Sequence, residues 1–238
     1  MRLSHLMLLL ATLLAAFVPG PPAQAVAGPS GHWEGKIQIP EREMAFSVDL
    51  APGPAGAWTG SLSVHGMDVP LSDVTVNGGT VRFTAALPGM TSFEGTLSAD
   101  AARLSGKVSN VEGAVPFELA RKGEANVKRP PASSLLSKDF EGTWEGSVER
   151  DGRVMRLVMK LSAAPDGTAR GLLVSVDKGN LEIPVTAVTL DARQLHLDVR
   201  GVAGSYRGTL DAGGAIVGEW AEKTIRVPLT FKRVAEAK

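Results

Sequence analysis

Two short stretches, each centred on a tryptophan, begin two similar halves of the chain. Gly31-His32-Trp33-Glu34-Gly35 returns 111 residues later as Gly142-Thr143-Trp144-Glu145-Gly146. Three further matches follow in the same order, at offsets of 114, 113 and 112 residues: 69–75 with 183–189, 93–99 with 206–212, and 115–117 with 227–229. This constancy indicates an internal duplication. The unit of roughly 90 residues is the size of a small domain.

Composition narrows the class of protein. The 238 residues suffice for one or two domains. Lys plus Arg number 25, and Asp plus Glu also number 25, so the chain has no net charge. Because nucleic-acid-binding proteins are usually basic, we do not expect nucleic acid as a partner. The 27 glycines and the scarcity of long helical runs favour an all-β fold. The absence of cysteine excludes disulfides, thiol catalysis and cysteine metal sites.

The N-terminus resembles a signal peptide, which we assign to residues 1–25. Arg2 precedes an apolar run over 6–18 that is short for a membrane span, and Ala23-Gln24-Ala25 forms a cleavage site. Cleavage after Ala27 and an uncleaved anchor are the alternatives. We therefore expect an exported protein, periplasmic or secreted, without a transmembrane span in the mature chain.

After Trp33 apolar and polar residues alternate with a period of two, as in Phe46-Ser47-Val48-Asp49-Leu50. Alternation is typical of antiparallel strands with one buried face. The pattern predicts eight strands in each copy, and eight hairpin-linked strands can close without leaving an edge. The predicted strands are 32–39, 43–50, 57–64, 69–76, 80–87, 91–99, 103–109 and 114–121, then 143–150, 153–161, 168–175, 182–190, 194–200, 204–211, 215–220 and 225–233.

We thus predict two tandem eight-stranded, up-and-down antiparallel β-barrels, at 31–122 and 139–234, joined by a polar, proline-containing linker at 123–138. Glycines recur at matched strand positions and are typical of bend points in small barrels. They are Gly35, Gly60, Gly95 and Gly106, matched by Gly146, Gly171, Gly208 and Gly218. One fused sixteen-stranded structure is the alternative. Short strands and few aromatic residues argue against a membrane barrel.

The G-x-W stretches resemble the motif that opens the first strand of lipocalins and other calycins. In that family a basic residue at the end of the last strand covers the tryptophan, a cation–π contact that closes one end of the barrel. The resemblance implies that Arg121 covers Trp33 and that Arg233 covers Trp144.

The chain also resembles the small lipocalin-like module that precedes the catalytic domain of some exported bacterial α/β-hydrolases. The second copy carries its motifs, namely Trp144-x-Gly146, Ile183-Pro184-Val185, Tyr206-Arg207-Gly208-Thr209-Leu210, Gly218-Glu219-Trp220 and Pro228-Leu229. It departs at Val176 and Lys178 in the turn Ser175–Gly179, and the first copy departs further. The hydrolase itself is missing.

Residues for catalysis are not apparent. No G-x-S-x-G nucleophile elbow is present, and Ser205 lies within a strand pattern. His32, His65 and His196 are not spaced as metal ligands. We therefore expect neither an enzyme nor a metal or cofactor site. In the turn of Ser175, Asp177 and Gly179, Asp177 either accepts backbone N–H groups or contacts a partner at the barrel rim.

A barrel of eight strands is either filled by side chains or wide enough for one small ligand. Alternation directs these residues inward: Phe46, Val48, Phe83, Leu87, Met155, Leu157, Met159, Leu195 and Leu197. Our leading hypothesis is a non-enzymatic binding protein that holds a small apolar or lipid-like ligand in a barrel. The alternative is a packed-barrel interaction module of the cell envelope, an accessory to a separate hydrolase.

Overall fold

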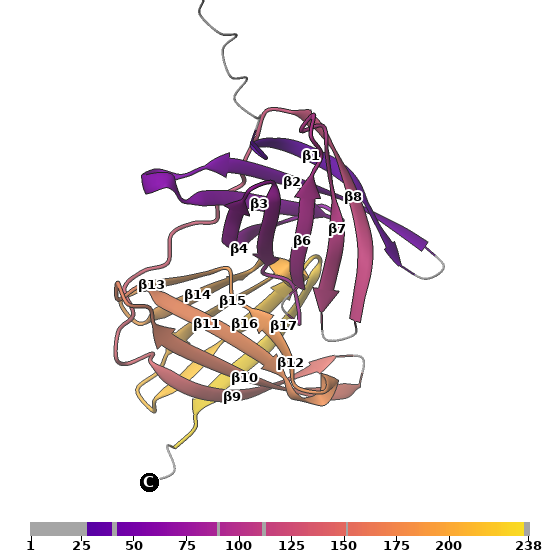
Figure 1. Ribbon diagram of the computed structural model, residues 1–238. Helices are drawn as coiled ribbons and strands as arrows, with labels where there is room; N and C mark the ends of the chain where they lie inside the picture. The colour runs from indigo at the N-terminus through magenta and orange to yellow at the C-terminus, as the bar shows by residue number, and fades with distance from the viewer. Residues whose placement is uncertain (1–27, 40–41, 90, 111–112, 151, 236–238) are drawn as a thin grey trace, which may run out of the picture.

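The chain forms two curled antiparallel sheets, one below the other in Figure 1. The computed structural model describes residues 28–39, 42–89, 91–110, 113–150 and 152–235. The predicted signal peptide, 1–25, lies outside the described residues. Within them no α-helix occurs, and three short 3-10 helices lie in turns: η1 (Pro54–Gly56), η2 (Val176–Lys178) and η3 (Arg200–Val202). The all-β prediction is confirmed.

The first sheet is a closed barrel in which each strand pairs with the next and β8 pairs with β1. This confirms the predicted eight-stranded, up-and-down barrel. Its strands are β1 (Gly31–Ile39), β2 (Arg42–Pro52), β3 (Trp58–Val64), β4 (Met67–Asn77), β5 (Thr80–Ala85), β6 (Thr91–Leu97), β7 (Arg103–Asn110) and β8 (Gly113–Gly123).

Alternation in the sequence becomes alternation of burial. In β5, Val81, Phe83 and Ala85 are buried, whereas Arg82 is exposed and pairs with Glu94 on the outer surface. Such strands bury one face against the barrel interior. Close backbone approach accompanies the curl: a Cβ atom added to Gly106 would collide with the Glu94 carbonyl oxygen, and the matched Gly218 lies equally close to that of Arg207.

The second sheet has nine strands in the order β12-β11-β10-β9-β17-β16-β15-β14-β13. This differs from the predicted second eight-stranded barrel. Its strands are β9 (Gly142–Arg150), β10 (Arg153–Ala163), β11 (Ala169–Ser175), β12 (Leu181–Pro184), β13 (Ala187–Asp191), β14 (Gln194–Val199), β15 (Gly204–Leu210), β16 (Ala215–Glu222) and β17 (Ile225–Arg233).

The extra strand arises because the predicted strand 182–190 is divided. β12 pairs with β11, and β13 pairs with β14. Between them the backbone changes partner, since the Val185 N–H donates to the Gly171 carbonyl (3.0 Å) and the Thr186 N–H to that of Asp198 (2.7 Å). The two edge strands are thus consecutive in the chain, and the sheet curls back on itself.

The segment between the sheets is held on both sides, although it contains only an isolated bridge, Leu135 with Thr168. Its Asn126 N–H donates to Oδ1 of Asp49 in the barrel (2.7 Å). Further on, the Ser134 N–H donates to the Val188 carbonyl (2.9 Å), and the Ser134 carbonyl accepts from the Ala169 N–H (2.8 Å). Ser134 therefore connects β13 to β11 where the edges of the second sheet meet.

The sheets also touch directly, at the connection between β5 and β6. The Gly89 N–H donates to the Glu182 carbonyl of β12 (2.9 Å). Gly201 in η3 faces the Ala86 carbonyl so closely that an added Cβ would lie 2.6 Å from its oxygen. The second sheet thereby fixes the β5–β6 connection of the first barrel.

Candidate functional site: a cavity at one end of the first barrel

One end of the barrel is closed by Trp33 and Arg121. The Trp33 side chain is fully buried, and its Nε1–H donates to the Pro29 carbonyl (2.9 Å). The guanidinium carbon of Arg121 lies 4.4 Å from the centre of the indole ring. Arg121 also donates to the carbonyls of Ala101 (2.8 Å), Gly28 (2.6 Å) and Ser30. These bonds fix the cation over the ring, a favourable arrangement.

The second sheet repeats this arrangement. The guanidinium carbon of Arg233 lies 4.2 Å from the ring centre of Trp144, which is also fully buried. The Trp144 Nε1–H donates to the Phe140 carbonyl (2.9 Å), and Arg233 donates to the carbonyls of Asp139 and Glu141. Both predicted Trp–Arg pairs are thus in direct contact.

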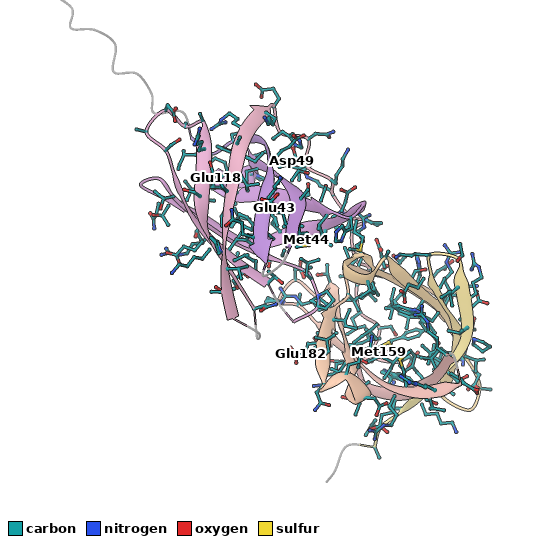
Figure 2. The ribbon with its side chains drawn as sticks, turned by 90° about the vertical axis from the view of Figure 1, so that its right-hand side faces the viewer. Glu43, Met44, Asp49, Glu118, Met159 and Glu182 are labelled. Carbon is teal, nitrogen blue, oxygen red and sulfur yellow. The ribbon has the colours of Figure 1, made fainter. Side chains whose placement is uncertain are left out.

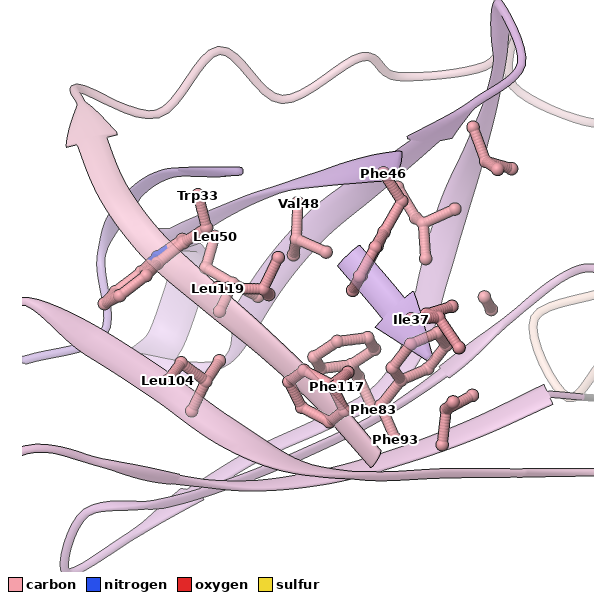
Figure 3. Packing of buried hydrophobic residues seen from close by; sticks show 14 of the residues in the cluster. Trp33, Ile37, Phe46, Val48, Leu50, Phe83, Phe93, Leu104, Phe117 and Leu119 are labelled. Atoms are coloured by element: carbon pink, nitrogen blue, oxygen red, sulfur yellow. The ribbon is translucent and has the colours of Figure 1, made fainter. Parts of the chain in front are cut away.

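Four phenylalanines fill the middle of the first barrel. The ring centre of Phe93 lies 4.8 Å from that of Phe83, 5.8 Å from that of Phe46 and 5.7 Å from that of Phe117. Figure 3 shows this cluster on one side, with Trp33 and its neighbours on the other. Buried side chains therefore pack together from the Trp33 end to the phenylalanines.

Beyond the phenylalanines the opposite end holds a cavity of about 410 Å³, within the usual range for small-molecule sites. Its walls are apolar, and the polar side chains of its lining are Thr91, Ser109 and Asn110. Among the described residues the lining has no charged side chain. It consists of Ile37, Met44, Phe46, Leu62, Val64, Leu87, Thr91, Phe93, Val108, Ser109, Asn110, Gly113, Ala114 and Val115.

The predicted interior residues of the first copy divide between cavity and core. Phe46 and Leu87 line the cavity. Val48 and Phe83 are buried in the core cluster and are not among the lining residues. Leu87 belongs to the β5–β6 connection that the second sheet contacts, so the second sheet adjoins the cavity wall.

The predicted interior residues of the second copy belong mainly to a packed core. Met159, Leu195 and Leu197 are buried there, and Figure 2 shows Met159 among the side chains inside the curled second sheet. Leu157 is half-buried against this core, and Met155 is half-buried.

The two copies differ at one register position beside the cavity. In the barrel, Val108 of β7 lies between Phe93 and Val115. In the second sheet, Trp220 of β16 lies between Tyr206 and Val227. Trp220 packs against the core of its sheet. A large indole therefore stands at the position where the first barrel has a small side chain and a cavity.

Sequence reasoning missed most of the lining, including Ile37, Met44 and Val108. Alternation alone could have pointed to Met44, because it precedes Phe46 by two positions in β2. The lining combines the end of β1, β3 and β7 with the start of β2, β6 and β8. Only the strand register brings these ends together.

The turn of Ser175, Asp177 and Gly179 is a fixed feature of the second sheet. Asp177 accepts from the Arg156 backbone N–H (2.7 Å) and from its Nε (3.0 Å) and Nη2 (2.6 Å). These bonds to Arg156 lower the pKa of the Asp177 carboxyl. Ser175 is buried, and Gly179 has a φ of 69°. Asp177 thus ties the turn to β10 rather than to its own backbone.

A polar cluster lies on the outside of the barrel. Nδ1 of His32 lies 2.9 Å from Oδ1 of Asp49, and its Nε2 lies 3.2 Å from Oε1 of Glu34. Burial lowers the pKa of His32, whereas the hydrogen bonds to the carboxylates of Asp49 and Glu34, and their charges, raise it. Together the carboxylates outweigh burial, so the net shift of the pKa is upward.

The other candidates for chemistry are dispersed. Burial and the charge of Arg207 lower the pKa of His196, and burial raises that of Tyr206, whose hydroxyl donates within the second core. Across the described parts of the chain, no three His, Cys, Asp or Glu side chains form a potential metal site. None of the described helices is long and apolar enough to span a membrane.

Comparison with known proteins gives remote structural matches. No family model matches the chain, and no curated protein does. A candidate outer membrane protein of Bacteroides fragilis NCTC 9343 aligns with 85% of this chain and 95% of its own, at 12% identity and a TM-score of 0.29. A DUF3598-family protein of unknown function from Nostoc punctiforme PCC 73102 aligns with 86% and 96%, at 15% identity and a TM-score of 0.26.

Proposed function

We propose that the chain is an exported, lipocalin-like binding protein that holds one small apolar ligand in its first barrel. The cavity of about 410 Å³ at the end opposite Trp33 carries this proposal. Its apolar wall matches sites that bind by burying hydrophobic surface, with a few polar groups at one side. The proposed location is the periplasm or the outside of the cell, since the N-terminal sequence has the features of a signal peptide.

The second sheet serves this function as a support. It contacts the β5–β6 connection through Glu182 and Gly201, and this connection contributes Leu87 to the cavity wall. A support for a binding site requires no ligand of its own. This division of roles explains why one copy keeps a cavity while the other has a packed core, against which Trp220 lies.

Calorimetric titration with naphthalene and with dodecanol tests the function. We expect saturable binding of one molecule of at least one of these compounds, with a negative heat-capacity change as apolar surface is buried. The double variant T91G/V108W, which transfers the Gly–Trp pair of the second sheet into the barrel, should abolish binding. Val217→Trp adds an indole at an exposed position of β16 and is the matched control. Absence of binding to the wild-type protein would overturn the proposal.

A second candidate is a packed interaction module, accessory to a separate hydrolase. It is favoured by the filled interior around Met159 and Tyr206 and by the motifs shared with hydrolase-associated modules. Affinity purification from the producing cells, with wild type and T91G/V108W as parallel baits, separates the two functions. An interaction module should retain its partner in both baits, because the substitutions lie inside the barrel.

A further inference from the structure

Trp220 occupies in the second sheet the place that the cavity occupies in the first. Gly204, the residue matched to Thr91, lies against its indole: a Cβ added to Gly204 would collide with Cζ2 of Trp220. Both positions are fixed by register, since Gly204 pairs with Val199 as Thr91 pairs with Ala85. The indole therefore extends over the part of the interior that matches the cavity wall at Thr91.

The two copies use this part of the interior differently. In the second sheet the indole needs the space that Gly204 leaves free, since an added Cβ would collide with it. In the barrel, the matched positions hold Thr91 and the smaller Val108, and both line the cavity. The Gly204–Trp220 pair thus fills the space that the Thr91–Val108 pair leaves open. The second sheet contains, as part of its own chain, the kind of group that fits this space.

We propose that the ligand of the first barrel is an uncharged ring compound, and that the Trp220 side chain is its built-in counterpart in the second sheet. The proposal rests on the function proposed above and specifies the class of ligand. A flat aromatic side chain fits the matched space, and the wall of the open space includes the rings of Phe46 and Phe93. Aromatic groups pack favourably in offset or edge-to-face arrangements with such rings.

The phenylalanine cluster also limits the shape of the ligand. Phe93 and Phe46 belong both to the cavity wall and to the cluster that fills the middle of the barrel. A long acyl chain extended along the barrel axis would collide with Phe83 and Phe117 behind them. A compact ring system needs only the open end.

The polar groups of the lining indicate that the ligand is uncharged. Thr91, Ser109 and Asn110 are neutral, and the described lining provides no opposite charge for a carboxylate or an ammonium group. Burial of an unpaired charge costs much more than burial of a neutral polar group. A hydroxyl, a carbonyl or an ether on the ring compound can hydrogen-bond to these side chains.

The first experiment removes the indole ring of Trp220 and supplies free indole in its place. Trp220→Val introduces the side chain found at position 108, and we expect a lower Tm that rises when free indole is added. Trp58→Val removes an indole outside the cavity lining and is the control. The Tm gain of W220V should exceed that of wild type and W58V. An equal gain in all three proteins would contradict the inference. Trp220→Leu, a milder change, serves if W220V does not fold at all.

The second experiment compares ligands on the wild-type protein. We expect naphthalene to bind about tenfold or more tightly than naphthalene carboxylate, because the carboxylate must lose its hydration. Naphthalene should also bind more tightly than the linear alcohol dodecanol. Preference for dodecanol or for the carboxylate would overturn the ring-compound inference while the binding function stands. If none of the three binds, the binding function itself fails.

Discussion

His32 and Asp49 form a hydrogen-bonded pair on the outside of the first barrel, with Nδ1 and Oδ1 2.9 Å apart. Asp49 is only 4% exposed because the segment between the sheets covers it, and the Asn126 N–H donates to the same carboxylate oxygen. The pair therefore connects three parts of the chain: β1, β2 and the segment that leads to the second sheet.

This pair makes stability depend on pH. The folded-state pKa of His32 is raised, so its contribution is fully present below the unfolded pKa of about 6.5 and is lost as pH rises through the folded pKa. Urea unfolding at about pH 5.5 and pH 8.5 measures the effect. The stability difference between wild type and His32→Gln should be larger at the lower pH. An equal difference at both values would contradict the predicted pKa shift.

Arg121 should matter far more than exposed arginines. Arg121→Ala removes a cation over Trp33 and the donors to three backbone carbonyls, and we expect a loss of about 2–3 kcal/mol in unfolding free energy. Arg121→Lys keeps the charge but not the planar fork, so its loss should be intermediate. Arg103→Ala breaks an exposed pair with Glu118 and should cost below about 1 kcal/mol. Equal losses for R121A and R103A would refute this role.

Gly35 should tolerate no side chain. A Cβ at this position would collide with the backbone oxygen of Glu118 in β8, and a backbone atom cannot move aside easily. We expect Gly35→Ala to cost about 2–3 kcal/mol, measured by denaturant unfolding. Gly123→Ala is the control, because its Cβ would enter open space. A neutral G35A variant would show that β1 and β8 are not in this close contact.

Ser134 should stabilise the second sheet through its backbone more than through its side chain. Its hydroxyl accepts from the Leu190 N–H (3.0 Å), and Ser134→Ala should cost about 1 kcal/mol. Ser134→Pro also removes the N–H that donates to Val188, so its cost should be at least about 2 kcal/mol. Thermal unfolding followed by tryptophan fluorescence ranks the two variants. The reverse order would exclude the backbone contribution.

The strands of both sheets could be predicted because alternation and turn residues are local signals. The division between β12 and β13 could not. The core-facing residues change phase within 182–190, from Ile183 and Val185 to Val188 and Leu190. The first copy has the same shift within the single strand β4, which only changes register between Ser72 and Thr75, so the side-chain pattern does not distinguish one strand from two. Which strand accepts the N–H groups of Val185 and Thr186 is a property of register rather than of residue type.

The cavity was predictable in kind but not in place. Alternation directs both Phe46 and Phe83 inward, yet Phe46 lines the cavity and Phe83 packs within the core. Their depth in the barrel depends on strand register. The sequence shows Trp220 as part of the Gly218-Glu219-Trp220 motif. The space that its indole occupies in the interior depends on Gly204, which lies on the neighbouring strand β15.

The first barrel, as proposed above, carries a ligand. Native mass spectrometry of protein purified gently from the cells that make it, compared with a denatured sample, tests this most directly. We predict an additional mass on the wild-type protein that is lost on denaturation and is missing from T91G/V108W, with Val217→Trp behaving as wild type. The same additional mass on T91G/V108W, or a bare chain mass for the wild-type protein, would contradict the claim.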